Sequence, residues 1–541
     1  MKQLLLPKHT VLHFGNESLS NHFNVTKISL RWFASKQESY FSAIGGESDE
    51  PPPDLSPQQV TSILRRNEKT IYKNLKAVKL IECNQLAANH PVEDRLRISR
   101  INLNASGESG CSETLLLSVF DGHGGGACVD IISKRLFHYI ALSLSPNPTD
   151  VLNNKIEAAV EDLFVCPKVN SDSAFIYDSK SLEKIKVLLN SAENECLQKF
   201  ADELQKNPAS DVKDALRKAF VHCDNDLAQE VEQHLSNESS SNIILHYYLS
   251  VAASGCCVTL LLIHNNKCYV ASSGDCRAVL GVQSEETSSG EFSMKCIPLS
   301  KDHNSDNIKE IKRLYASHPA NEQNNIIKNN RLLGHLMPLR AFGDYCYKWS
   351  VDKIKKVGLT RAFGPHIIPP HYYTPPYLIA DPEITVFDPF VPGSESKKFV
   401  VLATDGLWEQ FESATNLVDS VIKQQTTLAK KEGSESEKMS HKFSEGTSLT
   451  TINDYLTVNA KPQKTDFNDS LNIDGEHEFD SNCCTYLIRS ALGACPVHSD
   501  PHFDECEIQR QHRRLVTFLT LPESVVRNFR DDISVILTHF K

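Results

Sequence analysis

Short apolar runs separated by polar turns are the recurring pattern along this chain. Runs of this length, rich in Val, Ile and Leu, are typical of buried strands. They predict strands at 115–120, 256–263, 267–272, 277–282, 399–403 and 533–538. Polar turns at 264–266 and 273–275 join the second, third and fourth of these runs, which predicts an antiparallel meander.

Longer segments with apolar residues at helical spacing lie between these strands. The segment that follows Gly126 is apolar at 131, 132, 136 and 140, which predicts a helix. Further helices are predicted at 308–317 and 407–423, and order is expected to begin near Pro57 with a helix that runs through Ile71. Grouped antiparallel strands with blocks of helix between them predict an α+β fold rather than alternating βαβ units.

Two segments have the character of insertions into this fold. Residues 151–240 have mostly the pattern of amphipathic helix, whereas 430–482 are rich in Ser, Thr, Asn, Asp, Glu and Lys. Few large apolar residues occur in the second segment, which predicts a mobile excursion from the domain. Three prolines at 51–53 follow an acidic stretch, so residues 36–56 are interpreted as a linker.

Composition narrows the class of protein without identifying it. Of the 541 residues 40% are hydrophobic, and the net charge of −11 argues against nucleic-acid binding by phosphate neutralisation. The apolar runs are far shorter than the ~20 residues that a membrane-spanning helix needs. The 16 cysteines contain no C-x-x-C pair, so we interpret them as mostly reduced thiols and keep a zinc site as the less favoured alternative.

The first 35 residues have the charge bias of an organellar transit peptide. Their one acidic residue, Glu17, stands against basic residues at 2, 8, 27 and 31, and Ser and Asn are frequent. We interpret residues 1–35 as a mitochondrial transit peptide, with the matrix as the predicted location. A secretory signal fits less well because the apolar run at 4–6 ends at Pro7. A tail of chance composition remains the alternative.

Four short motifs place an acidic residue at the end of an apolar strand or beside a Gly turn. They are VEDR (92–95), FDGHGG (120–125), ATDGLW (403–408) and RDDI (530–533). Carboxylates gathered beside a core cost stability unless a cation neutralises them. Carboxylate and carbonyl oxygens suit Mg²⁺ or Mn²⁺ better than zinc. Each motif alone is commonplace, but together they predict a site for hard divalent cations.

A site of this kind is suited to the hydrolysis of phosphate esters. Two cations ~3.5–4 Å apart can activate water and hold the oxygens of a phosphate ester. His123, two residues after Asp121, has a side chain whose unperturbed pKa near ~6.5 suits it to protonate the leaving alkoxide. A cysteine nucleophile is disfavoured, because the one C-x5-R match, 483–489, lacks a Gly-rich turn to hold a phosphate.

These motifs, in their order, resemble the metal-dependent (PPM, type 2C) serine/threonine protein phosphatases. The resemblance covers roughly 58–540 and rests on FDGHGG (120–125), SGCC (254–257), GDCR (274–277), RAFGD (340–344), ATDGLW (403–408) and RDDI (530–533). It implies one catalytic domain over 57–541, with the two insertions, built as an antiparallel β-sandwich flanked by helices in α-β-β-α layers. It also implies two Mg²⁺ or Mn²⁺ ions per subunit, held in a cleft at one edge of the sheets.

The resemblance also assigns roles to individual residues. Asp121 would bridge both ions, Gly122 would offer its carbonyl, and Asp405 and Asp531 would ligate as well. His123 would be the general acid. The remaining assignments are support through water for Glu93 and Asp94, and a weaker third ion for Asp275 and Glu409.

One departure from the family pattern points to a subgroup. Many members carry an arginine that binds the substrate phosphate where this chain has Asn89. We expect Asn89 to bind the phosphate instead, since its amide can hydrogen-bond a phosphate oxygen, but it offers neither charge nor a bidentate fork, so phosphate binding must depend more on the metals. The same departure occurs in the mitochondrial pyruvate dehydrogenase phosphatases, which the chain also resembles at NQLAAN (84–89), KDHN (301–304), RLLG (331–334), LMPLRAFGD (336–344) and PPHYYTPPYL (369–378).

The subgroup resemblance implies a substrate and partners. The substrate would be phosphoserine on the pyruvate dehydrogenase α subunit, reached by docking on the lipoyl domains of the acetyltransferase core. It leaves open a regulatory subunit and calcium sensitivity. Two alternatives remain: another mitochondrial phosphoprotein as substrate, and an inactive scaffold of the same fold. The scaffold is disfavoured because Asp121, Asp405 and Asp531 are all present.

Overall fold

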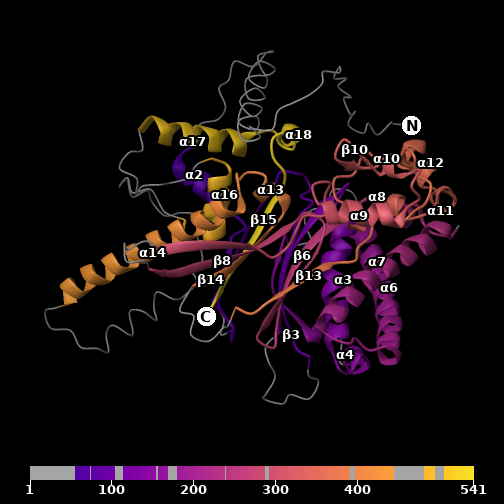
Figure 1. Ribbon diagram of the computed structural model, residues 1–541, viewed down its shortest axis with the longest axis horizontal. Coiled ribbons are helices and arrows are strands. Elements are labelled where there is room, and N and C mark those ends of the chain that lie inside the picture. Colours follow the sequence, from indigo (N-terminus) through magenta and orange to yellow (C-terminus); the bar gives the residue numbers. More distant parts are fainter. Residues whose placement is uncertain are drawn as a thin grey trace, which may run out of the picture. The chain divides into compact units, whose positions relative to one another are not determined.

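Two antiparallel sheets face each other between layers of helices (Figure 1). The computed structural model describes residues 55–72, 75–103, 114–153, 156–167, 179–237, 239–286, 292–389, 397–443, 480–493 and 505–541. The predicted α+β sandwich with α-β-β-α layers is confirmed. Among the described residues no helix is both long and apolar enough to cross a membrane.

One sheet has six strands, in the order β1-β2-β15-β14-β8-β9. Their bounds are β1 Lys69–Ile71, β2 Val78–Leu86, β8 Arg277–Glu286, β9 Phe292–Pro298, β14 Lys398–Ala403 and β15 Ile533–Phe540. The last strand of the chain lies at the centre of this sheet, where Ile533 pairs with Leu86 and Ala403 pairs with Val535. The first and last parts of the domain therefore belong to one sheet.

The other sheet has the order β13-β7-β6-β4-β3-β5, and β12 also pairs with β6. Its strands are β3 Arg95–Ile101, β4 Thr114–His123, β5 Val160–Cys166, β6 Gly255–His264, β7 Lys267–Ser273, β12 Phe342–Gly343 and β13 Glu383–Phe387. A separate hairpin joins β10 Ile327–Lys328 to β11 Arg331–Leu332. Nearly every residue of β4 and β6 is buried. Such strands read as continuous apolar runs because the second sheet covers one face and helices cover the other.

Helices cover the outer face of each sheet (Figure 1). On β3, β4 and β6 lies α3 Ala127–Leu144, which in turn contacts α6 Ser179–Lys206, α7 Val212–Ser236 and α8 Asn242–Ala253. On the six-stranded sheet lie α14 Ala414–Phe443 and α16 Cys483–Ala491, with α2 Pro57–Leu64 and α17 Glu505–Thr520 beyond them. The shorter helices are α4 Pro148–Asn153, α5 Ile156–Ala159, α9 Ile308–Ser317, α10 Gln323–Ile326, η2 Tyr345–Tyr347, α11 Val351–Lys356, α12 Leu359–Phe363, η3 Pro365–Ile367, α13 Asp405–Trp408 and α18 Glu523–Val526.

The predicted three-stranded meander is wrong. β6 and β7 form a hairpin whose turn residues Asn265 and Asn266 have positive φ, as a tight two-residue turn requires. The chain then crosses to the other sheet, where β8 pairs with β14 and β9. All three strands are apolar on both faces, so the sequence pattern does not distinguish a neighbour in one sheet from a strand in the facing sheet.

Two predicted helices have other bounds. The helix at 57 ends at Leu64, and Ile71 lies in β1. The helix predicted at 407–423 is two helices, α13 and α14, interrupted at 409–413. The helix at 308–317 is confirmed as α9.

The segment 151–240 holds α6 and α7, as its amphipathic pattern predicts, and also β5, which pairs with β3 at the sheet edge. One buried ion pair and one buried contact between a histidine and a carboxylate fasten these helices to α3. Arg135 contacts Glu230 at 2.5 Å, and His138 contacts Glu193 at 2.6 Å. The leader and most of the linker, with residues 444–479 of the second predicted insertion, lie outside the described residues.

Candidate active site

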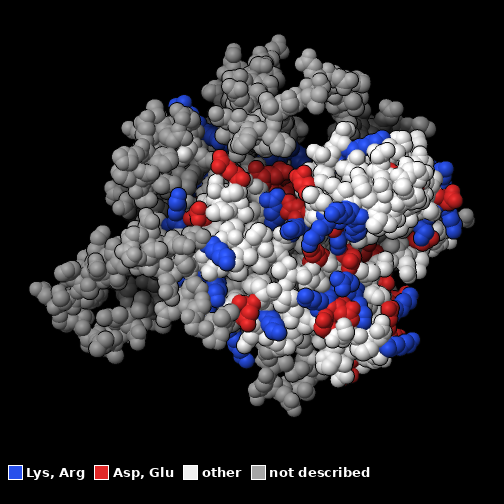
Figure 2. All heavy atoms as spheres, in the orientation of Figure 1, with Lys and Arg blue, Asp and Glu red and all other residues white. Residues whose placement is uncertain are grey.

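The acidic motifs converge where strands of both sheets end. Asp121 is near the end of β4, Asp405 follows β14, and Asp531 precedes β15. Asp275 lies where the chain crosses from one sheet to the other, between β7 and β8. Figure 2 shows acidic side chains gathered near the place that α13 and α18 occupy in Figure 1.

Three carboxylates form what we call the acidic cluster: Asp121, Asp275 and Asp405. One oxygen from each lies within 4.8 Å of the others. Desolvation raises the pKa of Asp121, and repulsion from Asp405, Asp94, Asp275 and Asp531 raises it further.

The pKa of Asp405 is raised in the same way, by desolvation first and then by Asp275, Asp531 and Glu409. Its buried Oδ1 atom has no hydrogen-bond partner among the described residues. A buried oxygen without a partner, facing other carboxylates, fits a hard divalent cation.

Two further acidic residues, from the β2–β3 loop, flank the acidic cluster. Asp94 is buried and accepts a hydrogen bond from Thr404 Oγ1 at 2.8 Å, and Glu93 accepts one from the backbone N–H of Gly125 at 2.6 Å. Burial is the first cause that raises the pKa of both side chains. Gly122 is needed here because a Cβ at that position would overlap the carbonyl oxygen of Glu93.

Asp532 is a positioning residue that the sequence did not single out. Its carboxylate accepts hydrogen bonds from the backbone N–H groups of Asn89 and Glu93, both at 2.8 Å, and from Asn89 Nδ2 at 2.9 Å. It is 1% exposed. Asp532 therefore fastens the loop that carries Glu93 and Asp94 to the start of β15. The doublet DD was the available signal, but the sequence does not tell which aspartate faces the loop.

Asp531 lies near enough to the acidic cluster to raise the pKa of Asp121 and Asp405, and it has a different partner. Its Oδ1 lies 2.5 Å from Arg527 Nη1 and 3.4 Å from Asn89 Nδ2. Burial raises the pKa of Asp531, an effect that Arg527 opposes. Asp531 therefore already has a cationic partner from the chain, unlike Asp121 and Asp405.

His123 has a carboxylate partner that the sequence did not predict. Its Nε2 lies 2.6 Å from Asp344 Oδ2. Burial lowers the pKa of His123, but the charge and hydrogen bond of Asp344 raise it more, so the net pKa is above its usual value. Asp344 lies in the motif RAFGD, so the residue was visible in the sequence although its contact was not.

Helix α7 reaches this histidine through a short chain of contacts. Asp224 accepts a hydrogen bond from the backbone N–H of Gly343 at 2.9 Å and pairs with Lys348 at 2.6 Å. Asp344, the next residue, has left-handed backbone with φ 51°. A Cβ at Gly255 would overlap both His123 and Asp344, so only glycine leaves room for their pairing.

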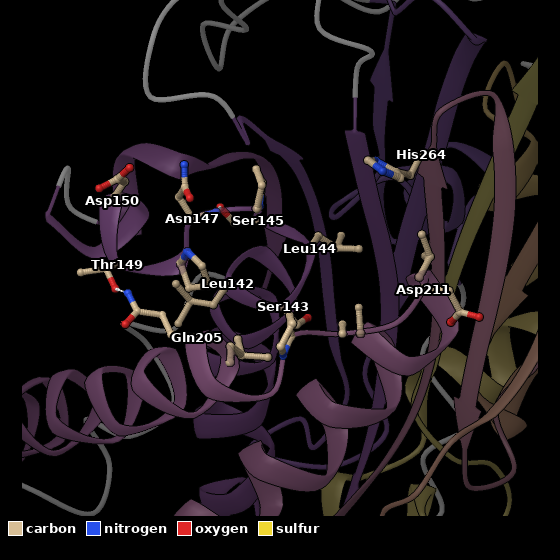
Figure 3. A pocket seen from close by; sticks show the side chains of 17 residues that line it. Leu142, Ser143, Leu144, Ser145, Asn147, Thr149, Asp150, Gln205, Asp211 and His264 are labelled. Atoms are coloured by element: carbon tan, nitrogen blue, oxygen red, sulfur yellow. Dashed lines mark hydrogen bonds between the residues drawn. The ribbon is translucent and has the colours of Figure 1, made fainter.

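The structure also has a cavity that lies apart from the acidic cluster. A cavity of about 590 Å³ lies between the end of α3, α4 and the ends of α6 and α7 (Figure 3). Its lining is polar and apolar in similar measure, and a hydrogen bond between Gln205 and Thr149 crosses part of it. None of the residues assigned to the metal site or to proton transfer lines this cavity.

The known proteins to which this chain is similar agree with the site described above. A sequence model of the family "Protein phosphatase 2C" matches residues 175–443. The chain is 34% identical to the human mitochondrial phosphatase 2 of acetyl-transferring pyruvate dehydrogenase, over 91% of this chain and 85% of that protein. It is 34% identical to the bovine phosphatase 1 of the same name, over 90% and 83%. A solved phosphatase 2C from Toxoplasma gondii aligns with 87% of this chain at 16% identity and a TM-score of 0.39.

The relatives define the class of protein, a hydrolase, and the carboxylates gathered at the ends of the two antiparallel sheets suit a divalent metal. The chain belongs to the protein phosphatase 2C family. Its activity is that of a protein serine/threonine phosphatase.

Proposed function

We propose that this phosphatase removes phosphate from phosphoserine on the α subunit of pyruvate dehydrogenase in the mitochondrial matrix, and so reactivates it. The observation that supports this substrate is the likeness to pyruvate dehydrogenase phosphatases along nearly the whole chain. The basic leader at 1–35 supports the location. Docking on the lipoyl domains of the acetyltransferase core is part of the proposal.

We further propose that two Mg²⁺ or Mn²⁺ ions bind the acidic cluster. Asp121, the carbonyl of Gly122, Asp405 and Asp531 would hold them, and Glu93 and Asp94 would act through water. Asp275 and Glu409 would complete a weaker third site. When bound, such ions neutralise the carboxylates and lower the pKa of water so that it attacks phosphorus directly. The unpartnered Oδ1 of Asp405 supports this binding set.

The protein's own residues supply the proton. His123 would protonate the serine oxygen as it leaves, and Asp344 favours the imidazolium form because its charge and hydrogen bond raise the pKa of His123. The pairing also fixes the ring, since Nε2 is held 2.6 Å from Asp344 Oδ2.

The decisive experiment compares substrates. Protein that lacks residues 1–35 should dephosphorylate phosphorylated pyruvate dehydrogenase complex much faster than an unrelated phosphoprotein, and only with added Mg²⁺ or Mn²⁺. Equal rates on both substrates would overturn the proposed substrate. Metal-independent turnover would overturn the mechanism, and no turnover on either substrate would indicate an inactive scaffold.

A further inference from the structure

A substrate phosphate carries two negative charges, and the site offers it few positive ones. Asn89, predicted from the sequence to bind the phosphate, has both N–H bonds of its side chain in use, so that prediction is wrong. Its Nδ2 lies 2.9 Å from Asp532 Oδ2 and 3.4 Å from Asp531 Oδ1. The side-chain oxygen of Asn89 can only accept, so this amide has no donor left for a phosphate.

Arg527 brings a cation to the same place from another part of the chain. It follows α18, four residues before Asp531, and its Nη1 lies 2.5 Å from Asp531 Oδ1 and 3.6 Å from Glu93 Oε2. Its side chain is 45% exposed.

The other arginines near the site are already committed to the protein. Arg277 makes three hydrogen bonds to Asp302, at 2.6–2.9 Å. Arg95 pairs with Asp130 and also donates to backbone carbonyls, and Arg530 is buried and donates to the carbonyl of Ala87. Within the described part of the chain, the side chain of Arg527 makes one hydrogen bond, to Asp531, a carboxylate that we assign to a metal ion.

We propose that Arg527, rather than Asn89, binds the substrate phosphate, and that it neutralises Asp531 until a divalent cation does so. This inference rests on the proposed function for its phosphate role. A cation at Asp531 competes with the guanidinium for the same oxygens, which weakens the ion pair. The guanidinium of Arg527 can then donate hydrogen bonds to the phosphate, because its planar shape matches two phosphate oxygens at once.

The test uses Arg527→Gln, Arg527→Lys and, as a matched control, Arg361→Gln on the exposed face of α12. With a phosphoserine peptide, R527Q should raise KM and the inhibition constant of inorganic phosphate by roughly 10- to 100-fold, as expected for a lost charge-assisted hydrogen bond. R527K should be intermediate because it keeps the charge but not the fork, and R361Q should match the wild type. Wild-type KM and phosphate inhibition in R527Q would overturn the phosphate role.

A binding measurement without turnover tests the second half. Mn²⁺ titrated calorimetrically into metal-free protein should bind R527Q several-fold more tightly than wild type, because the competing cation is gone. Unchanged or weaker binding would overturn the competition with Asp531. If the wild type binds Mn²⁺ but hydrolyses no phosphopeptide, the proposed function is wrong. The titration still decides whether Arg527 competes with the cation for Asp531.

Discussion

On the helical side of the molecule, buried carboxylates lie against cations of the chain itself, whereas at the sheet ends the carboxylates lie against one another. The helical cluster consists of Arg135, His138, Glu193 and Glu230. Hydrogen bonds and charge from His138, Arg135 and Lys134 overcome desolvation and lower the pKa of Glu193 to about 2. In the acidic cluster the same chemical group has a raised pKa.

The difference separates a structural cluster from a binding site. The helical cluster is neutralised internally, so it fastens α6 and α7 to α3 without any ligand. The carboxylates of the acidic cluster repel one another, which lowers the stability of the folded protein. A cation that binds from solution removes this repulsion. A carboxylate removed from one cluster should therefore have the opposite effect on stability from one removed from the other.

The largest expected effect is on catalysis in the acidic cluster. Asp405→Asn should lower kcat by more than the roughly 10- to 100-fold that is typical of losing a residue behind metal ligands. At pH 7 the metal-free variant should melt above metal-free wild type, because one repelling charge is gone. Mg²⁺ or Mn²⁺ should raise the melting temperature of wild type but much less that of D405N.

Thermal unfolding with and without a chelator, together with phosphopeptide turnover, checks both parts. Asp352→Asn, an exposed position on α11, serves as the control and should change neither. If metal-free D405N is less stable than metal-free wild type, repulsion among these carboxylates does not destabilise the protein.

The next largest effect is expected on stability, in a variant that disrupts the helical cluster. Glu230→Ala leaves Arg135 buried with one carboxylate fewer, which should lower the free energy of unfolding by about 3–5 kcal/mol. On the same helix, Glu232 pairs with Lys353 at a more exposed position, and Glu232→Ala should cost about 1 kcal/mol or less. Denaturant titration of both variants measures the difference. Equal losses would show that burial does not decide the strength of these pairs.

The smallest effect concerns the pair of His123 with Asp344, beside the acidic cluster. Asp344→Asn leaves burial as the main influence on His123, so its pKa should fall below the usual value. The imidazolium needed as general acid is lost as pH rises through that pKa, so the alkaline limb of kcat should move to lower pH. At pH 8 kcat should fall by about tenfold for each unit by which the pKa falls, since the protonated fraction changes tenfold per unit above the pKa.

The pH profile of kcat on a phosphoserine peptide measures this shift, and p-nitrophenyl phosphate, which has a good leaving group, should show little of it. His123→Gln is the reference because it removes the limb altogether. The same pair also affects stability: because its folded pKa is raised, its contribution is complete below the unfolded pKa of histidine and is lost as pH rises through the folded pKa. An unshifted profile in D344N would remove Asp344 from this role.

Local information in the sequence determined much of this protein. Apolar runs located β4, β6, β14 and β15, and the spacing of apolar residues located α3 and α9, because burial imposes a period on each element. Acidic residues at the ends of those runs indicated the site, since a carboxylate there needs a counter-charge. The order of the motifs then indicated the family.

The tertiary structure decided which elements and side chains meet. β8 crosses to the other sheet, and that crossing brings Asp275 to Asp121 and Asp405. Strands buried on both faces look alike in sequence, so their sheet is fixed only when the two layers pack.

The same reason applies to the partners of the site. Asp532 accepts hydrogen bonds from a loop more than 400 residues away in sequence, and Asp344 reaches His123 across 221. Arg527 meets Glu93 only after β15 has entered the sheet beside β2. Residue types and their spacing reflect the secondary structure and burial of each segment. Contacts between residues so far apart in sequence form only when the whole chain packs.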